Sequence, residues 1–202
     1  MFRIINIGVL SQNKFWGETE RMREDISATC TLLEVGGKRI IVDPSPKRTD
    51  LKRVLFNRAG LRPDAIDIVY VTHWHGDHLF GLRLFKDAVW TMAASGLAEW
   101  YEKAPGYHHL HERFVAAEGA LPDGVKVYPA PGHTPTLAAL KTVTEWGDLI
   151  VAGDAVMNRE YFAAEEGYHN SVDFDVAAET IRRIKADAAL VIPGHDNLIL
   201  NS

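Results

Sequence analysis

The run His73-Trp74-His75-Gly76-Asp77-His78 constrains this chain more than any other stretch, because it places three imidazoles and one carboxylate within six residues. These groups are the ligands that zinc prefers, and they also suit iron and manganese. The run follows the apolar stretch 66–71, which predicts a β-strand, and Gly76 gives the backbone the freedom to fold several side chains towards one point. We therefore predict a metal-chelating turn at the end of a strand.

The composition indicates one globular domain with a sizeable core, spanning residues 1–202, of which 47% are apolar and 24% charged. The net charge of -5 argues against binding to nucleic acid or to an anionic membrane surface. The start of the chain does not resemble a signal peptide, and no apolar run reaches membrane-spanning length. We therefore expect a cytoplasmic protein that acts on a small molecule, with a homo-oligomer left open. The single cysteine, Cys30, lies in a strand-like run and is expected to be buried and inert.

Stretches with the patterns of strands and helices alternate along the chain. Expected strands are residues 3–10, 28–35, 38–42, 66–71, 88–92, 125–128, 137–143, 148–152 and 188–192, and expected helices are residues 49–59, 95–103 and 175–185. Gly36-Gly37 predicts a tight hairpin between the second and third strands. Thr49 or Asp50 is expected to cap the first helix, and Asp173 or Asp175 the last.

Three further candidate ligands follow strand-like stretches or lie in turns framed by proline and glycine. They are His133 in Pro131-Gly132-His133, Asp154 after residues 148–152, and His195 in Pro193-Gly194-His195. Taken singly, each would more often be an ordinary loop or capping residue. Because the ends of strands in one sheet lie side by side, however, several strand ends that carry ligand residues predict one shared metal site.

In order, spacing and local context, the run 73–78, Pro131-Gly132-His133, Gly153-Asp154 and Pro193-Gly194-His195 resemble the metallo-β-lactamase superfamily over nearly the whole chain. The resemblance implies an α/β (α+β) fold, a four-layer αββα sandwich with metals at one edge of the two sheets. It also implies that His73, His75 and His133 hold one metal, that Asp77, His78 and His195 hold a second, that Asp154 bridges both, and that Asp43 supports the metal-binding loop.

Two metals held in this way imply a hydrolase in which a metal-bridging hydroxide attacks a small ester, lactone or thioester. Zinc is the expected metal, and iron or manganese is compatible with the same ligands. Asp77 can also pass a proton to the leaving group, although its duty as a ligand competes with that role.

Within the superfamily, the sequence resembles the acyl-homoserine-lactone lactonases and a group of short hydrolases that includes a histone pre-mRNA nuclease. Asp154 argues against a true β-lactamase, since those enzymes generally lack the bridging aspartate. The lactonases carry a catalytic tyrosine three residues after that aspartate, where this chain has Met157. Either Tyr161 or Tyr168 replaces it, or the substrate is not a lactone.

Alternative functions stay open from the sequence. They are a phosphodiesterase or nuclease, which the negative charge disfavours, a mononuclear iron oxidoreductase of the persulfide-dioxygenase type, and metal binding without catalysis. The substrate pocket is expected to include Trp16, Trp74, Tyr161, Tyr168 and His169. The histidines His108, His109 and His111 are expected at its rim rather than on a metal.

Overall fold

The computed structural model describes residues 1–201, apart from the side chain of Tyr107. A six-stranded sheet contains, in spatial order, β1 (Phe2–Asn6), β2 (Cys30–Val35), β3 (Lys38–Val42), β4 (Ile68–Tyr70), β5 (Val89–Met92) and β6 (Phe114–Ala116). A five-stranded sheet contains, in spatial order, β11 (Ile199–Leu200), β10 (Leu190–Pro193), β9 (Gly147–Gly153), β8 (Ala138–Thr144) and β7 (Val125–Pro129). The α-helices are α1 (Arg48–Ala59), α2 (Gly76–Leu79), α3 (Ala94–Lys103), α4 (His108–His111), α5 (Arg159–Ala164) and α6 (Phe174–Asp187).

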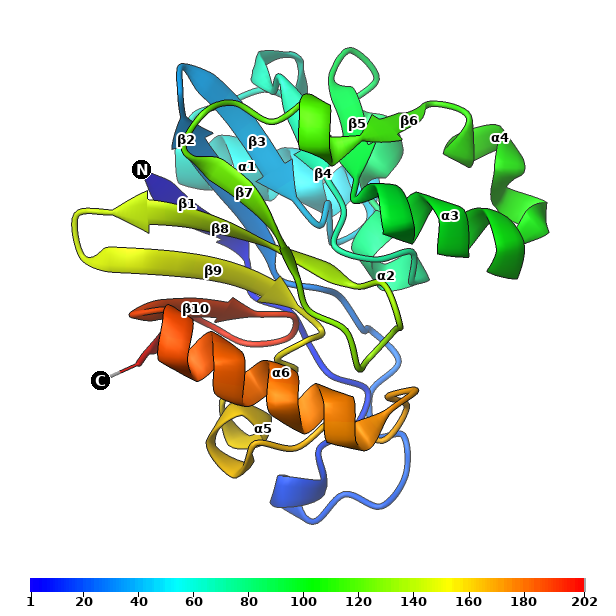
Figure 1. Cartoon of the computed structure of the whole chain (residues 1–202). Coiled ribbons are helices and arrows are strands. Elements are labelled where there is room, and N and C mark those ends of the chain that lie inside the picture. The colour runs from blue at the N-terminus through cyan, green and yellow to red at the C-terminus, as the bar shows by residue number, and fades with distance from the viewer. Residues whose placement is uncertain (202) are drawn as a thin grey trace.

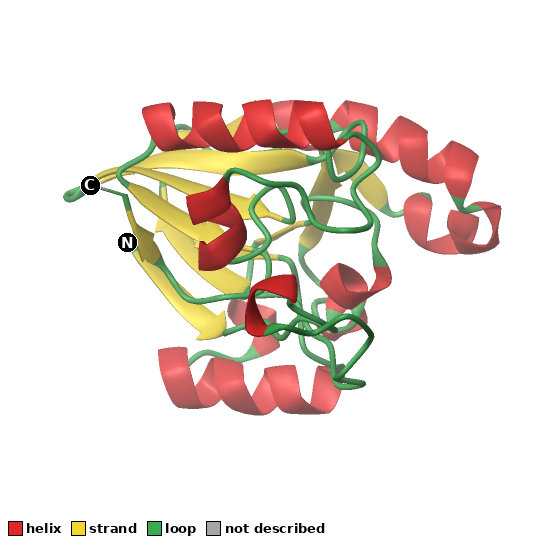
Figure 2. Ribbon diagram, turned by 90° about the horizontal axis from the view of Figure 1, so that it is seen from below, coloured by secondary structure: helices red, strands yellow, loops and turns green. Residues whose placement is uncertain are grey.

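The two sheets face each other, and helices cover their outer surfaces (Figure 1). Figure 2 shows the strands enclosed between helices on two opposite sides. Side chains of α1 and α3 belong to an apolar cluster with the six-stranded sheet, and side chains of α6 to a cluster with the five-stranded sheet. The predicted αββα sandwich is therefore confirmed. Among residues 1–201, no helix is both long enough and apolar enough to span a membrane.

Apolar residues on both faces of the central strands explain the four layers. Successive side chains of a strand point to opposite faces of its sheet. In β3, Ile41 belongs to the cluster that includes Leu51 of α1, whereas its neighbour Ile40 belongs to the cluster that includes Leu140 of β8. The five-stranded sheet alternates in the same way between the other sheet and α6. Each sheet must therefore be covered on both sides.

Two local predictions in the six-stranded sheet are confirmed. Gly36-Gly37 joins β2 and β3 as an antiparallel hairpin, with Val35 opposite Lys38. Cys30, at the start of β2, is fully buried, and burial raises the pKa of its thiol to about 12. The thiol is therefore protonated and shielded at neutral pH.

The predicted helix start is right for α6 and wrong for α1. Asp173 is the N-cap of α6, and its Oδ1 accepts a hydrogen bond from Val176 N (3.0 Å). In α1, Thr49 and Asp50 lie inside the first turn, and the N-cap Lys47 makes no capping hydrogen bond with its side chain. Asp50 still favours this helix, because a negative charge in the first turn interacts well with the helix dipole.

The first strand ends earlier than predicted. β1 stops at Asn6, and beyond it Val9 makes only an isolated bridge with Ser27. A Cβ at Gly8 would lie 2.6 Å from both Ser27 O and Thr29 N. Backbone from distant parts of the chain therefore approaches too closely here for regular pairing to continue, and the segment after β1 runs on towards the metal centre as a loop.

Candidate metal centre

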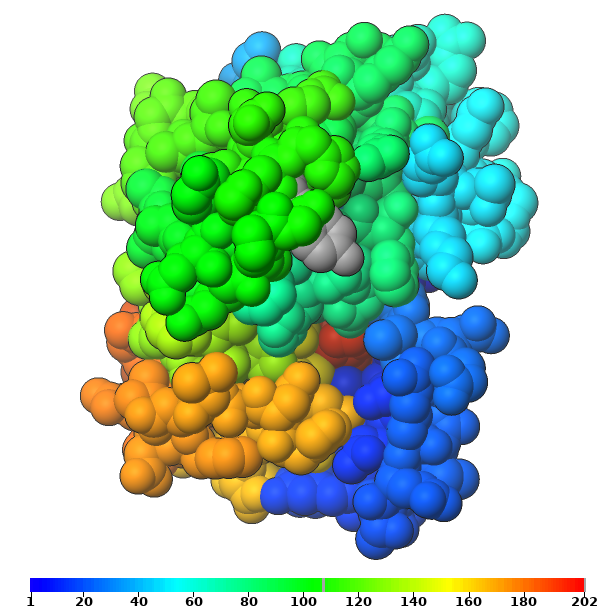
Figure 3. Space-filling view, turned by 90° about the vertical axis from the view of Figure 1, so that its right-hand side faces the viewer, coloured from blue at the N-terminus to red at the C-terminus, as the bar shows by residue number. Residues whose placement is uncertain are grey.

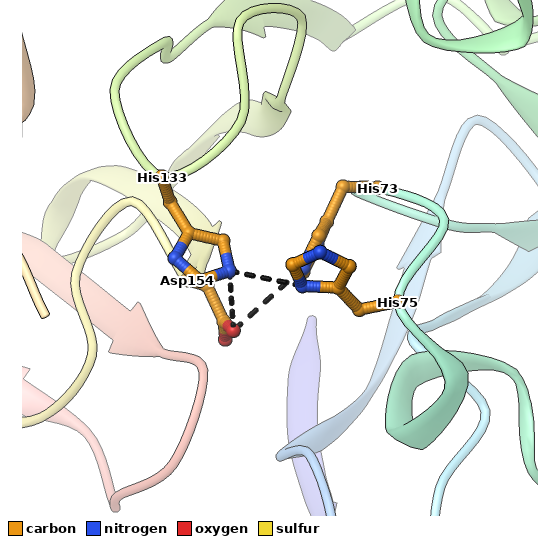
Figure 4. Close-up of side chains that lie close together, drawn as sticks. All are labelled: His73, His75, His133 and Asp154. Atoms are coloured by element: carbon orange, nitrogen blue, oxygen red, sulfur yellow. Dashed lines mark hydrogen bonds and ion pairs between the residues drawn. The ribbon is translucent and has the colours of Figure 1, made fainter. Parts of the chain in front are cut away.

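The seven predicted metal ligands come together at one edge of the two sheets. They form two groups, in each of which the ligand atoms lie within 4.8 Å of one another: His73, His75, His133 and Asp154 in the first group, and Asp77, His78 and His195 in the second. Figure 4 shows the first group, in which His133 and Asp154 face His73 and His75.

Each ligand lies close to the end of a strand or in a loop between strands. His73 and His75 follow β4, Asp77 and His78 lie on the short helix α2, His133 lies between β7 and β8, Asp154 follows β9, and His195 follows β10. Both sheets therefore contribute ligands to each of the two groups.

Asp154 lies between the two groups. Its Oδ2 is 3.2 Å from His133 Nε2 and 3.7 Å from His73 Nε2. Its Oδ1 is 3.1 Å from His78 Nε2 and 3.2 Å from His195 Nε2. One carboxylate thus directs one oxygen at each group, which is the arrangement that a bridging ligand requires.

Contacts on the outer ring nitrogens orient the histidines. His195 Nδ1 donates a hydrogen bond to Ser27 O (2.9 Å), so that its Nε2 faces Asp154. His78 Nδ1 lies 2.9 Å from Asp43 Oδ2, and its Nε2 also faces Asp154. Such outer partners fix the tautomer of a histidine that binds a metal.

Asp43, which the resemblance implies to be a supporting residue, contacts the metal-binding turn at several points. Its Oδ1 accepts a hydrogen bond from Thr72 N (2.8 Å), and its Oδ2 accepts one from Thr72 Oγ1 (2.9 Å). Because the Thr72 hydroxyl donates to Asp43, its oxygen is left to accept from His73 Nδ1 at 3.1 Å. The Nε2 of His73 is then unprotonated and free to coordinate a cation.

The inward-facing atoms fit divalent cations. His73 Nε2, His78 Nε2 and Asp154 Oδ1 are buried and have no hydrogen-bond partner in the described part of the chain, which is costly unless a cation satisfies them. Burial lowers the pKa of His73 well below its usual value and that of His133 to about 4, so both are neutral at pH 7. Burial alone would raise the pKa of Asp154, but His78 and His195 hold it well below its usual value.

Gly194 leaves the space that the Asp154 carboxylate occupies. A Cβ at this position would overlap Asp154 Oδ1 and lie 3.0 Å from the carbonyl carbon of Gly153. We expect Gly194→Ala to displace the carboxylate and to weaken metal binding by about 10- to 100-fold, measured by competition with a chromogenic chelator. A Cβ at Gly119 meets nothing within 4 Å, so Gly119→Ala is the matched control. Unchanged affinity in Gly194→Ala would contradict this role.

A small cavity of about 100 Å³, the inner cavity, opens onto the ligands. It is lined by Leu10, Ser11, Ile26, His75, Asp77, Asp154, Met157, Tyr168, Asn170 and His195. It shares His75, Asp77 and Asn170 with a larger space of about 530 Å³, the apolar groove, which is also lined by Trp74, Gly76, Leu79, Phe80 and Leu110. Figure 3 shows the face on which the blue N-terminal segment, the green middle segment and the orange segment near residue 170 surround a hollow.

Two of the five predicted substrate-contacting residues line these spaces. Trp74 forms part of the apolar groove, and Tyr168 forms part of the inner cavity. The Tyr168 hydroxyl donates to Gln12 O (2.9 Å) and lies 3.1 Å from Ser11 Oγ. A phenol is therefore present beside the ligands, although not at the position of Met157.

The other three predicted residues lie elsewhere. Tyr161 is only 1% exposed, because it lies on the buried face of α5 and packs behind Tyr168, with the ring centroids 5.3 Å apart. Trp16 is exposed and lines a separate cavity of about 280 Å³ with Arg159. His169 is exposed, and its ring contacts Tyr168. The sequence pattern could not distinguish these positions, because the tertiary packing decides which side chains face the ligands.

The histidines between α3 and β6 make contacts of their own. His108 stacks on Tyr101, with ring centroids 4.1 Å apart, and Arg83 Nη2 donates to His109 Nε2 (3.1 Å). His111 Nε2 lies 2.9 Å from a backbone carbonyl oxygen of α3. Among the described residues these histidines belong to neither ligand group, whereas Leu110 between them lines the apolar groove.

Sequence reasoning missed Ile26 and Asn170 in the inner cavity. Neither follows a strand or belongs to a motif, so the sequence carries no signal for them. Leu110 in the groove belongs to the segment 107–111, which was expected at the wall of the pocket.

Comparison with known proteins supports one family. The sequence model of the metallo-beta-lactamase superfamily matches residues 23–195. The beta-lactamase-like protein 2 homolog of Caenorhabditis elegans is 26% identical over 83% of this chain and 55% of its own length. An atrochrysone carboxyl ACP thioesterase of Aspergillus fumigatus is 23% identical over 84% of this chain and 51% of its own length. The chain thus spans about half the length of these two curated relatives.

Solved structures share the fold. A Thermotoga maritima protein solved as a candidate metallo-beta-lactamase has a TM-score of 0.71 and 21% identity, over 98% of both chains. A dizinc quorum-quenching lactonase with a bound product has a TM-score of 0.69 and 16% identity, over 83% of this chain and 72% of its own. With this fold, its cluster of histidines and aspartates, and a match from residue 23 to residue 195, the chain belongs to the metallo-beta-lactamase superfamily.

Proposed function

We propose that this chain is a binuclear zinc hydrolase that cleaves a small ester, lactone or thioester. The observation that carries the proposal is the position of Asp154, whose two carboxylate oxygens face two separate groups of ligands. A mononuclear centre would need only the first group. The second group, which contains His78 and His195, would then be a buried set of polar side chains with no cation to offset the cost of burying them.

The residues present divide naturally between two cations. His73, His75 and His133 would hold one, Asp77, His78 and His195 the other, and Asp154 both. When bound, two zinc ions polarise the substrate oxygen and supply a hydroxide nucleophile at neutral pH.

Asp77 is placed to move a proton during the reaction. Its side chain lines both the inner cavity and the apolar groove, whereas Asp154 lines the inner cavity. Asp77 therefore faces the substrate and can take up a proton and return it to the leaving alcohol or thiol. Asn170 lines both spaces as well, where its amide can donate a hydrogen bond to the substrate.

The surroundings of the centre favour an acyl substrate over a phosphodiester. The apolar groove contains Trp74, Leu79, Phe80 and Leu110. A neighbouring cavity of about 380 Å³ is lined by Glu24, Asp25 and Asp50, with Lys47 as its one cationic side chain. These carboxylates repel a polyanionic backbone. The lactonase and the thioesterase among the similar proteins both act, by name, on acyl compounds.

Metal analysis and a substrate panel test the proposal together. Protein purified without added metal is expected to contain two zinc ions per chain and to hydrolyse at least one member of a panel of p-nitrophenyl esters, lactones and acyl thioesters. One iron per chain with oxygen consumption would instead assign an iron oxidoreductase. Salt-sensitive cleavage of single-stranded oligonucleotides would assign a nuclease. Either of these outcomes, or a metal-loaded protein inactive on the whole panel, contradicts the proposal.

A further inference from the structure

The apolar groove leads directly from the metal ligands. His75 and Asp77 belong both to the groove and to the inner cavity, so that a molecule can occupy the two spaces at once. Away from these ligands, the walls are formed by the apolar side chains of Trp74, Leu79 and Leu110, together with Phe80. A volume of about 530 Å³ falls within the usual range of small-molecule sites.

One wall of the groove is fixed by Glu99, a half-buried residue of α3. Its Oε1 accepts a hydrogen bond from Trp74 Nε1 (3.2 Å). Its Oε2 accepts a hydrogen bond from Thr136 N (3.2 Å) and another from Thr136 Oγ1. The carboxylate therefore ties α3 both to the turn that carries the first ligands and to the loop that follows His133.

The partners of Glu99 indicate positioning rather than simple charge neutralisation. All three hydrogen bonds come from neutral donors, and each needs an acceptor in a fixed place. Hydrogen bonds to an ionised acceptor are stronger than those between neutral groups. The Trp74 ring also lies against the ring of His75, with centroids 5.0 Å apart and planes at 78°. The orientation of this wall is thus linked to a metal ligand.

We propose that the apolar groove binds an apolar acyl arm of the substrate, and that Glu99 is the positioning residue that holds Trp74 as its wall. This inference rests on the acyl-hydrolase function proposed above. It narrows the substrate class to esters, lactones or thioesters whose apolar acyl arm extends into the groove while the reacting carbonyl lies beside Asp77.

Alkyl hydroxamates test the groove without turnover. Acetohydroxamate and octanohydroxamate share a metal-binding head and differ only in the length of the alkyl arm. Calorimetry on the zinc-loaded protein is expected to show that octanohydroxamate binds about 50-fold more tightly than acetohydroxamate. The logarithm of this affinity ratio is roughly half of the value expected if the six additional methylene groups were completely buried. Equal affinities for the two compounds would overturn the proposal.

Single variants distinguish the contribution of the groove wall to binding from that of the metal centre. Trp74→Ala is expected to reduce the ratio of the two affinities to about fivefold. Leu110→Ala, on α4, should also lower the ratio, and it lies outside the turn that carries the metal ligands. If both variants fold and keep the wild-type ratio, the alkyl arm lies elsewhere and the proposal fails.

Glu99→Gln tests the positioning role, because glutamine keeps the size of the side chain but offers one acceptor oxygen instead of two. We expect it to lower the ratio to about 10-fold and to leave acetohydroxamate binding unchanged. Glu102→Gln is the control, since Glu102 lies on the same helix with its side chain 73% exposed. An equal loss of affinity for both compounds in Glu99→Gln would show a merely structural role.

The calorimetry also distinguishes failure of this proposal from failure of the proposed function. If the protein binds octanohydroxamate preferentially but hydrolyses no acyl substrate, the proposed function fails and the proposed role of the groove stands. If it hydrolyses esters with no dependence on chain length and binds both hydroxamates equally, the proposed role of the groove fails and the proposed function stands.

Discussion

Asp154→Asn is expected to lower kcat by about 100-fold or more and to reduce the bound zinc from two ions per chain to one or fewer. Asparagine keeps the shape of the side chain, but it has a single oxygen and no charge. Only one ligand group can then retain its oxygen, and an amide nitrogen faces the other group. Steady-state kinetics and elemental analysis on the same preparation measure both effects.

Asp148→Asn provides the control for this experiment. Asp148 lies on the same strand, β9, where its Oδ2 is 2.8 Å from Lys141 Nζ and its side chain is 39% exposed. The same loss of charge there should change neither metal content nor turnover. Two zinc ions and wild-type kcat in Asp154→Asn would refute the bridging role of this residue.

Removal of metal is expected to abolish hydrolysis and to lower the midpoint of thermal unfolding by about 10 °C. Cations that bind only the folded chain contribute about 4 kcal/mol at free concentrations near 1,000 times Kd, and in a chain of this size each kcal/mol shifts the midpoint by about 2–4 °C. Differential scanning calorimetry before and after treatment with a chelator measures the shift, and added zinc should reverse it.

The Asp154→Asn variant serves as the reference for the unfolding experiment. Because it holds less metal, chelation should lower its midpoint by a smaller amount than in the wild type. An identical midpoint for chelated and zinc-loaded wild-type protein would mean that the inward-facing atoms of His73 and His78 are satisfied without a cation.

The positions of the candidate ligands could be predicted because the residues next to each of them in the sequence carry a clear signal. Asp154 follows an apolar run typical of a strand, and His195 follows Pro193-Gly194 at the end of a second apolar strand. Because the ends of neighbouring strands must lie close together, the local sequence pattern was enough to predict that these ligands share one site. Trp74 could be predicted as a wall of the groove because it lies within the ligand run. Ile26 and Asn170 in the inner cavity could not be predicted, because they come from loops whose places depend on the packing of the whole fold.

The fold was predictable to a similar extent and for similar reasons. Long elements with a strong apolar pattern, such as α6 and β9, are found close to their predicted bounds. β6, α5 and β11 were not predicted, because they contain three, six and two residues and are too short to show a periodicity. The choice between Tyr161 and Tyr168 depends on which face of α5 is buried, a property of its neighbours rather than of its own sequence.

Each group of ligands draws on both sheets, and this has a mechanical consequence. A bound cation acts as a reversible cross-link between the two halves of the sandwich, in a chain whose single cysteine rules out an internal disulfide. Away from the centre, apolar side chains between the sheets hold the halves together regardless of metal. Loss of the cations should therefore increase local opening first at the edge of the sheets that carries the ligands. Amide hydrogen exchange should rise in the loops around His133 and His195 before it rises in the strands.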